Sequence, residues 1–132
     1  MSPSAPLMAG MKGLIMGIAN ERSLAWGIAR AVTDHGAEIG VTYQGEVMAK
    51  RVVPLAESVV PKFIVPCNVT DEASLNDLFG EVEKTWGALD FLVHAIAFSD
   101  KEQLRERYVD TTAENFAQTL EISCFSFTAL CQ

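Results

Sequence analysis

Residues 13–29 read GLIMGIANERSLAWGIA, and this stretch decides the fold. The apolar run Leu14–Met16 is typical of a buried strand, and the residues after Gly17 lead into an amphipathic helix. Free backbone N–H groups and the positive end of the helix dipole meet at such a helix N-terminus and form an anion site. A dinucleotide pyrophosphate is the obvious ligand. Because Ala19 occupies the second glycine position of G-x-G-x-x-G, the loop alone also allows a plain strand-to-helix turn.

Composition and charge limit the class of protein. The 132 residues are 49% hydrophobic and 20% charged, which is typical of one globular domain. A net charge of −7 argues against nucleic acid and anionic membranes as partners. No apolar run approaches the ~20 residues of a spanning helix. The opening Met1–Pro6 lacks the cationic region of a secretory signal. We therefore expect a cytoplasmic protein with a flexible leader over residues 1–11.

The cysteines and histidines do not predict a metal site. Cys67, Cys124 and Cys131 are odd in number and show no C-x-x-C spacing, and His35 lies far from His94 in the sequence. Free thiols in a reducing compartment are the natural interpretation. His94 lies in an apolar run and is expected to be a hydrogen-bonded core residue.

Strand and helix patterns alternate along the chain. The helix ends are indicated by the N-cap Ser23, the glycine after His35 and a capping box at Thr111 and Glu114. Pro54 lies inside the second helix and should kink or break it. The apolar face of the first helix is expected to comprise Leu24, Ile28, Ala31 and Val32. Residues 99–110 are expected to form a polar loop, whose charged run Lys101–Arg107 is a solvated loop or a helix turn. The last helix is apolar nearly all round. The expected strands span residues 12–16, 38–43, 62–66 and 89–98, and the expected helices span residues 24–35, 45–59, 70–86 and 111–130.

This βαβαβαβ order with one further helix predicts an α/β fold, a Rossmann-like doubly wound parallel sheet. The run 89–98 should be a central strand covered on both faces. The chain ends at Gln132 without a helix-stop signal, so we expect the domain to be incomplete there.

Four stretches together resemble one family. They are Gly17–Ala29, Thr42-Tyr43-Gln44, Cys67-Asn68-Val69 and Val93–Phe98. The sequence resembles the N-terminal half of a short-chain dehydrogenase/reductase, specifically the bacterial enoyl-acyl-carrier-protein reductases of fatty-acid elongation. Ordinary members of the superfamily would carry T-G-x-x-x-G-x-G and N-N-A-G instead.

The resemblance implies a set of cofactor-binding residues. Gly17 would let the backbone approach the cofactor, because glycine has no Cβ. Ser23 and Leu24 would meet the pyrophosphate through main-chain N–H groups, and Ser23 would add its hydroxyl. Gln44 would lie beside the adenosine. For Ser23 a plain N-cap and for Gln44 an exposed loop residue are the alternatives.

Four further positions follow from the same resemblance. Asn68 and Val69 would lie by the adenine, with the Asn68 side-chain carbonyl accepting from an amino group in place of the usual Asp. Ile96 would pack near the nicotinamide. Ser99 would line the acyl substrate pocket, although a loop serine after a strand is commonly only a turn residue.

The cofactor expected is NADH. An acid after the second strand favours NAD, whereas an arginine favours NADP. Gln44 and Glu46 follow this strand, and the next arginine is Arg51, so a 2′-phosphate would find little positive charge.

The reaction implied by the resemblance is hydride transfer from NADH to an enoyl thioester on acyl carrier protein, by a homotetramer. The catalytic Tyr-x6-Lys pair would follow Gln132, so no catalytic or metal residue is assigned here. Residues 12–132 would be the N-terminal, cofactor-binding portion of one domain, without turnover alone. Another dehydrogenase/reductase acting on a carbonyl or alcohol and a non-catalytic nucleotide-binding module remain alternatives.

Overall fold

A parallel four-stranded sheet organises the chain in the computed structural model, which describes residues 4–132. Its order is β3-β2-β1-β4, and every neighbouring pair is parallel. The predicted Rossmann-like alternation of strands and helices is confirmed. The strands are β1 (Lys12–Met16), β2 (Glu38–Tyr43), β3 (Phe63–Pro66) and β4 (Phe91–His94).

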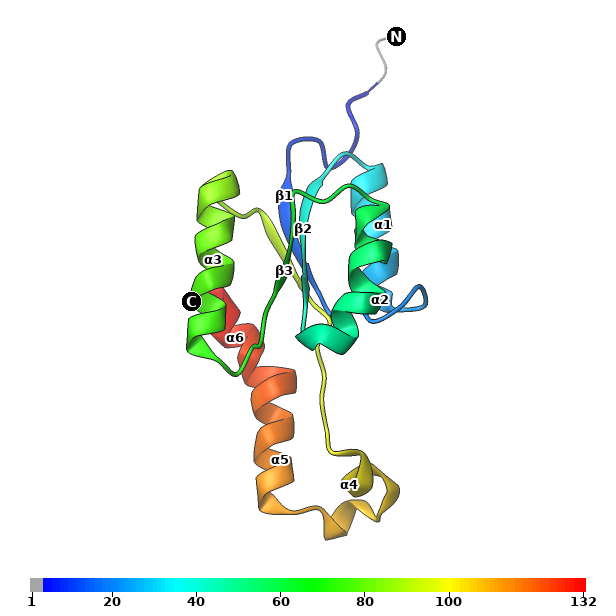
Figure 1. The fold of residues 1–132 in the computed structure, drawn as a ribbon, viewed down its shortest axis with the longest axis vertical. Coiled ribbons are helices and arrows are strands. Elements are labelled where there is room, and N and C mark those ends of the chain that lie inside the picture. The colour runs from blue at the N-terminus through cyan, green and yellow to red at the C-terminus, as the bar shows by residue number, and fades with distance from the viewer. Residues whose placement is uncertain (1–3) are drawn as a thin grey trace.

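Helices cover both faces of this sheet (Figure 1). Helices α1 and α2 lie on one face, α3 and α6 lie on the other, and α4 and α5 lie beyond the carboxyl ends of the strands. A π-helical turn, η2 (Glu121–Phe125), joins α5 to α6, and a 3-10 turn, η1 (Tyr108–Asp110), follows α4. The α-helices are α1 (Leu24–Asp34), α2 (Gly45–Glu57), α3 (Glu72–Trp86), α4 (Lys101–Arg105), α5 (Ala113–Leu120) and α6 (Ser126–Cys131).

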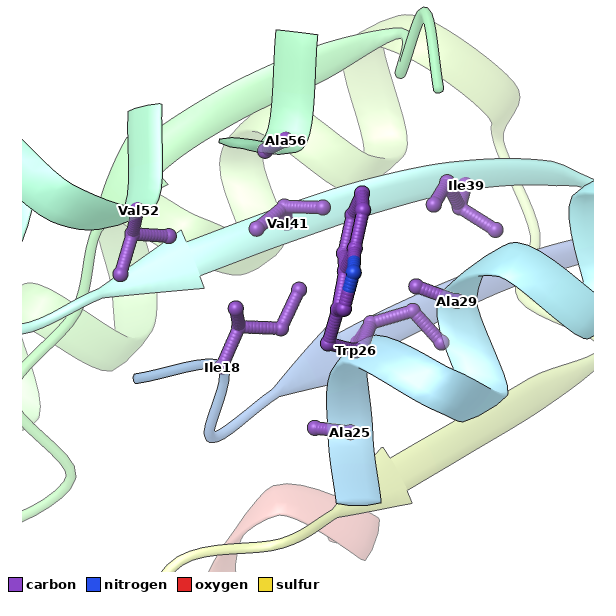
Figure 2. Packing of buried hydrophobic residues seen from close by; sticks show 9 residues of the cluster. Ile18, Ala25, Trp26, Ala29, Ile39, Val41, Val52 and Ala56 are labelled. Carbon is purple, nitrogen blue, oxygen red and sulfur yellow. The ribbon is translucent and has the colours of Figure 1, made fainter. Parts of the chain in front are cut away.

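Trp26 forms the centre of the core between α1, α2 and the sheet (Figure 2). It packs with Ala25 and Ala29 of the same helix, and of the predicted apolar face only Val32 packs against this core, partly buried. The side chain of Leu24 is 84% exposed and that of Ile28 is 39% exposed. The small side chains of the two alanines let the helix approach the sheet closely. The predicted face was based on the spacing of large apolar residues, so it did not include these alanines.

The core on the other face agrees with prediction. Leu78 and Val82 of α3 are buried against Leu14 and Met16 of β1, and Leu130 of α6 joins them. The predicted stripe of α3 is completed by residues that are partly buried against this cluster: Leu75, Phe79 and Trp86.

Two strand glycines lie beneath aromatic rings on neighbouring strands. Gly13 pairs in register with Phe91, and Gly40 pairs with Phe63. A Cβ on either glycine would overlap the ring of its partner. Close cross-strand approach therefore requires glycine at both positions.

The strand predicted over 89–98 is too long, because only Phe91–His94 forms β4. Among the described residues β4 is the outermost strand, next to β1. The apolar residues Ala95, Ile96 and Ala97 line hollows at the sheet edge instead of extending the ladder.

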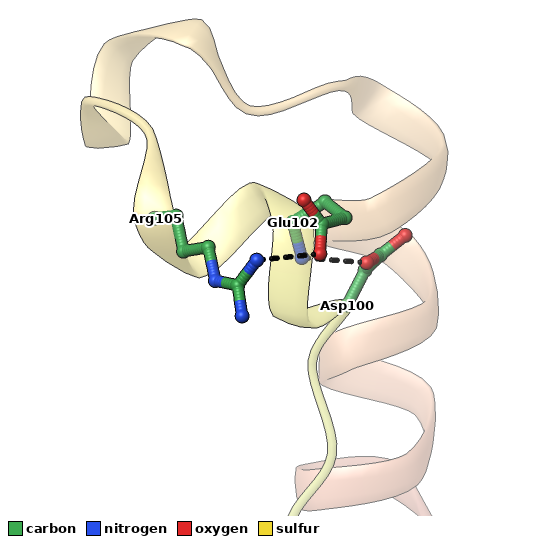
Figure 3. Close-up of polar contacts among 3 residues, drawn as sticks. All are labelled: Asp100, Glu102 and Arg105. Carbon is green, nitrogen blue, oxygen red and sulfur yellow. Dashed lines mark hydrogen bonds and ion pairs between the residues drawn. The ribbon is translucent and has the colours of Figure 1, made fainter.

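The polar stretch 99–110 contains α4, so its charged run takes the helix-turn alternative of the prediction. Asp100 caps α4 by accepting a hydrogen bond from the Glu102 backbone N–H at 2.9 Å, and the Arg105 guanidinium donates to the Glu102 carboxylate at 3.1 Å (Figure 3). The cap of α5 is Thr112 rather than Thr111, because the Thr112 hydroxyl accepts from the Asn115 N–H at 3.2 Å.

Three other local predictions can be compared with the structure. Helix α2 is not broken by Pro54 and continues to Glu57. His35 ends α1, and Gly36 follows with a positive φ of 96°, as predicted. Within the predicted leader, residues 1–3 lie outside the described part, and the Met8 N–H donates to the His35 carbonyl at 2.9 Å.

The described residues 4–132 contain neither a disulfide nor a cluster of metal-binding side chains. Cys67, Cys124 and Cys131 are free thiols. No group of three or more His, Cys, Asp and Glu side chains in this range could hold a metal ion. No helix of this range combines the length and apolarity needed to cross a membrane.

The last helical segment is less buried than predicted. Its pattern predicted burial on more than one side, but four of its large apolar residues are about half exposed: Phe116, Leu120, Phe125 and Phe127.

Candidate functional site

The carboxyl ends of all four strands meet at a crevice. One cavity of about 250 Å³ lies over β1, β2 and β3, and a second of about 500 Å³ lies between the start of α1 and the end of β4. Both are lined by Gly17 and by residues 95–97, so they form one continuous crevice. Open parallel sheets bind ligands at this edge. The predicted site residues among its lining are Gly17, Ser23, Leu24, Gln44, Val69 and Ile96.

The backbone conformation and packing at position 17 require glycine even without a cofactor. Its φ is +106°, and a Cβ at this position would overlap the backbone carbonyl oxygen of Ala95. The first turn of the crevice therefore exists because β1 and the end of β4 approach without an intervening side chain. The sequence interpretation, which assigned the glycine only to cofactor approach, missed this contact.

Ser23 is positioned immediately before α1, but its hydroxyl does not cap that helix. Its Oγ instead accepts hydrogen bonds from the backbone N–H groups of Ala19 at 2.9 Å and Asn20 at 3.0 Å. Ser23 therefore occupies the predicted N-cap position of α1, but its side chain makes no capping hydrogen bond there. Both hydrogen bonds use the oxygen as acceptor, which leaves the hydroxyl proton able to donate to a ligand.

The N-terminus of α1 opens into the crevice beside this hydroxyl. Leu24 and Ala25 line it, and the first helical bond in this turn runs from the Gly27 N–H to the Ser23 carbonyl at 3.2 Å. The N–H groups of the preceding residues have no partner within the helix. Together with the helix dipole they favour a negatively charged group.

Gln44 ends the second strand and lines the crevice on that side. It is exposed and its side chain makes no cap bond to α2, so its amide is available to a ligand. Glu46 is the acidic residue in the first turn of α2, and Arg51 lies about a turn and a half further along, exposed.

Val69 lines the crevice, whereas Asn68 does not. The Asn68 side-chain oxygen accepts from the Thr70 N–H at 3.1 Å and from the Thr70 hydroxyl at 2.8 Å. Its backbone N–H donates to the Ser74 hydroxyl at 2.8 Å. The side-chain carbonyl expected to meet a ligand thus holds a local turn, which presents Val69.

Cys67 forms part of the floor of the crevice. Burial raises the pKa of its thiol, with a hydrogen bond to Ser74 opposing the rise and the Asp71 charge adding to it. The thiol is therefore protonated at neutral pH and is an apolar wall rather than a nucleophile.

Ser99 lies outside the crevice, in a neighbouring hollow shared with α4. Its Oγ accepts hydrogen bonds from Thr119 Oγ1 at 3.1 Å and from Asn115 Nδ2 at 3.3 Å. His94 is hydrogen-bonded as predicted, with its Nε2 2.7 Å from Ser126 Oγ.

One Tyr-x6-Lys spacing occurs within the chain, at Tyr43 and Lys50, and the sequence argument overlooked it. Tyr43 ends β2 and packs against the core, whereas Lys50 is an exposed residue of α2. The two residues lie on different elements, so this spacing does not form a pair along one helix.

A parallel sheet with helices on both faces, a tight turn after β1 and an open helix N-terminus defines a Rossmann-like domain. A family model described as enoyl-(acyl carrier protein) reductase matches residues 17–132. The chain belongs to this family.

Individual relatives agree along nearly the whole chain. The enoyl-[acyl-carrier-protein] reductase [NADH] 1 of Rhizobium meliloti is 51% identical over 130 residues, which are 98% of this chain and 48% of the relative. The crystal structure of the Anaplasma phagocytophilum reductase in complex with NAD is 53% identical with a TM-score of 0.90, over 96% of this chain and 48% of that one. The Bacillus cereus reductase with NADP+ is 35% identical with a TM-score of 0.89, over 95% and 49%. The chain thus spans about half the length of these relatives.

Proposed function

We propose that this chain is the cofactor-binding part of an NADH-dependent enoyl-acyl-carrier-protein reductase. The observation that carries the proposal is the convergence of four strand ends and the α1 N-terminus on one crevice, in a member of this family. Residues 12–132 would form the N-terminal portion of a single dinucleotide-binding domain, preceded by the leader 1–11.

The cofactor would lie across the crevice with its pyrophosphate at the start of α1. The Leu24 N–H and the Ser23 hydroxyl would hold the phosphates, whereas the Ser23 N–H, expected from the resemblance to do so as well, already donates to the Asn20 carbonyl at 3.1 Å. Gln44 and Val69 would line the adenosine end, with Asn68 holding the turn that presents Val69. Ile96 would pack against the nicotinamide end.

NADH rather than NADPH is favoured by the charges around Gln44. Glu46 is in the first turn of α2 and Arg51 is a turn and a half beyond it, so the end of β2 carries an acid and no adjacent cation. A ribose hydroxyl can donate to such groups, whereas a 2′-phosphate would be repelled.

NADH held by these residues would supply the hydride for reduction of an enoyl thioester carried on acyl carrier protein. This chain's residues would bind and orient the cofactor, and Ser99 would line the acyl side. No residue of the chain is assigned to proton transfer. We infer a homo-oligomer, a tetramer by family resemblance, because aromatic residues along α5, η2 and α6 are half exposed. A reducing cytoplasm fits the three free thiols.

A comparison of substrates and cofactors tests the class of reaction. The protein at its natural length should oxidise NADH at 340 nm when given a crotonyl thioester, and NADPH should support a rate at least about tenfold lower, since a misplaced 2′-phosphate costs about 1.4 kcal/mol or more. The 132-residue chain alone should bind NADH without turnover.

The alternatives predict other outcomes in the same assay. Oxidation of secondary alcohols with no enoyl reduction would identify an ordinary dehydrogenase of the superfamily. NADH binding with neither activity at natural length would identify a non-catalytic nucleotide-binding module.

A further inference from the structure

A row of polar side chains runs along the last helical segment and faces the chain that leaves β4. We call residues 95–100 the strap, and we call the row the polar stripe. The strap runs from β4 beyond the carboxyl ends of the strands to α4 (Figure 1). The stripe extends over α5, η2 and the start of α6. The stripe is spaced by four, four and three residues, as expected for one helix face. It comprises Asn115, Thr119, Ser123 and Ser126.

Ser123 holds the middle of the strap with a single hydroxyl. Its Oγ accepts from the Phe98 N–H at 3.0 Å and donates to the Phe98 carbonyl at 3.2 Å. Within the described chain, these are the only hydrogen bonds recorded for the backbone of residues 96–99. The strap has no strand partner there, so this hydroxyl replaces a ladder bond.

Ser126 holds the point where the strap begins. It is 2% exposed, and its Oγ donates to the Ile122 carbonyl at 2.6 Å. Because a hydroxyl has one proton, the 2.7 Å contact to His94 requires that His94 Nε2 donates. This fixes the His94 ring beside the crevice, which it lines.

The far end of the strap is held in the same way. Thr119 and Asn115 donate to the Ser99 hydroxyl, and the Asp100 N–H donates to the Asn115 side-chain oxygen at 3.1 Å. The stripe therefore contacts the strap and its preceding residue at four points, His94, Phe98, Ser99 and Asp100.

Ile96 and Ala97 lie between the anchors at His94 and Phe98, and both line the crevice. The pyrophosphate position at α1 divides the crevice into a β2 side and a β4 side. The residue position that contacts the adenosine ribose follows the second strand, so the adenosine half of the cofactor would lie on the β2 side. The nicotinamide half would therefore lie on the β4 side, against the strap.

We propose that Ser123, supported by the rest of the polar stripe, is a positioning residue that sets the strap as the wall of the nicotinamide half of the crevice. Ser123 itself lines the crevice, but its hydroxyl accepts from the Phe98 N–H and donates to the Phe98 carbonyl, so it acts through the Phe98 backbone. The proposal rests on the proposed cofactor function and assigns to η2 a role beyond packing, consistent with the frequent occurrence of π-helical turns at functional sites.

Two ligands that differ only in the nicotinamide test this role. NADH and ADP-ribose are titrated calorimetrically into the wild-type protein, the Ser123→Ala variant and the matched control Thr128→Ala, whose side chain lies exposed on α6. Ser123→Ala should raise the Kd of NADH about fivefold, the value of one hydrogen bond, and change that of ADP-ribose less than about twofold. Thr128→Ala should change neither. Equal weakening of both ligands by Ser123→Ala would indicate a merely structural role and overturn the proposal.

Amide hydrogen exchange provides a readout without any ligand. The Phe98 amide should lose about tenfold protection in Ser123→Ala, while the Ala95 amide, bonded to the Met16 carbonyl at 3.0 Å, should keep its protection. Unchanged Phe98 protection would overturn the proposal. A wild-type protein that binds no NADH would refute the proposed function, and this exchange experiment would still decide whether Ser123 holds the strap.

Discussion

Substitution of Gly17 by alanine should destabilise the protein by about 3 kcal/mol and abolish NADH binding. A positive φ at a non-glycine residue costs about 1–3 kcal/mol. The added Cβ would also overlap the backbone carbonyl of Ala95, which cannot move without displacing the end of β4. Urea unfolding and NADH titration measure the two effects.

Gly27→Ala is the matched control for this substitution. Gly27 lies in α1, and a Cβ there would meet no atom within 4 Å. Alanine at an open helical position should stabilise the protein by about 0.5–1 kcal/mol. If Gly17→Ala were as stable as Gly27→Ala, the close approach of β1 and the strap would be contradicted.

Trp26→Ala should cost about 3–5 kcal/mol of unfolding free energy, the range for removal of a large buried aromatic side chain. Trp26 is 6% exposed and packs against the Ile39 and Val41 side of the sheet (Figure 2). The cavity left behind would also loosen the attachment of α1, whose N-terminus forms the proposed phosphate site.

Leu24→Ala provides the comparison on the same helix. The Leu24 side chain is 84% exposed, so its removal should change stability by less than about 0.5 kcal/mol. Its proposed role uses only the main chain, so NADH affinity should also be retained. Equal destabilisation by the two substitutions would contradict the observed orientation of α1.

The sequence predicted most of the fold because its strongest signals are local. The strand before Gly17, the acidic start of α3 and the glycine after His35 follow from chain chemistry within a few residues. The short length of β4 could not be predicted, because apolar residues that line a crevice and apolar residues that fill a strand give the same pattern.

The sequence predicted several of the residues that line the crevice, but it did not predict the hydrogen bonds that these residues and their neighbours make. The crevice lining includes Gly17, Gln44 and Ile96, as the family resemblance implied. Asn68 and Ser99 instead use their side chains in contacts within the chain. The polar stripe was not predicted because apolar residues dominate the pattern of the last helix, although the four-residue spacing from Asn115 to Ser123 is present in the sequence.

The central claim is that the crevice binds a dinucleotide with its pyrophosphate at Ser23 and the start of α1. Its most direct test is a calorimetric titration of NADH into the wild-type protein and Ser23→Ala. The account predicts saturable binding with a Kd below about 1 mM. It also predicts about tenfold weakening in Ser23→Ala, which loses a hydroxyl donor to a charged phosphate and the acceptor that orders the Ala19 and Asn20 amides. A folded wild-type protein without saturable binding, or equal affinity in Ser23→Ala, would contradict it.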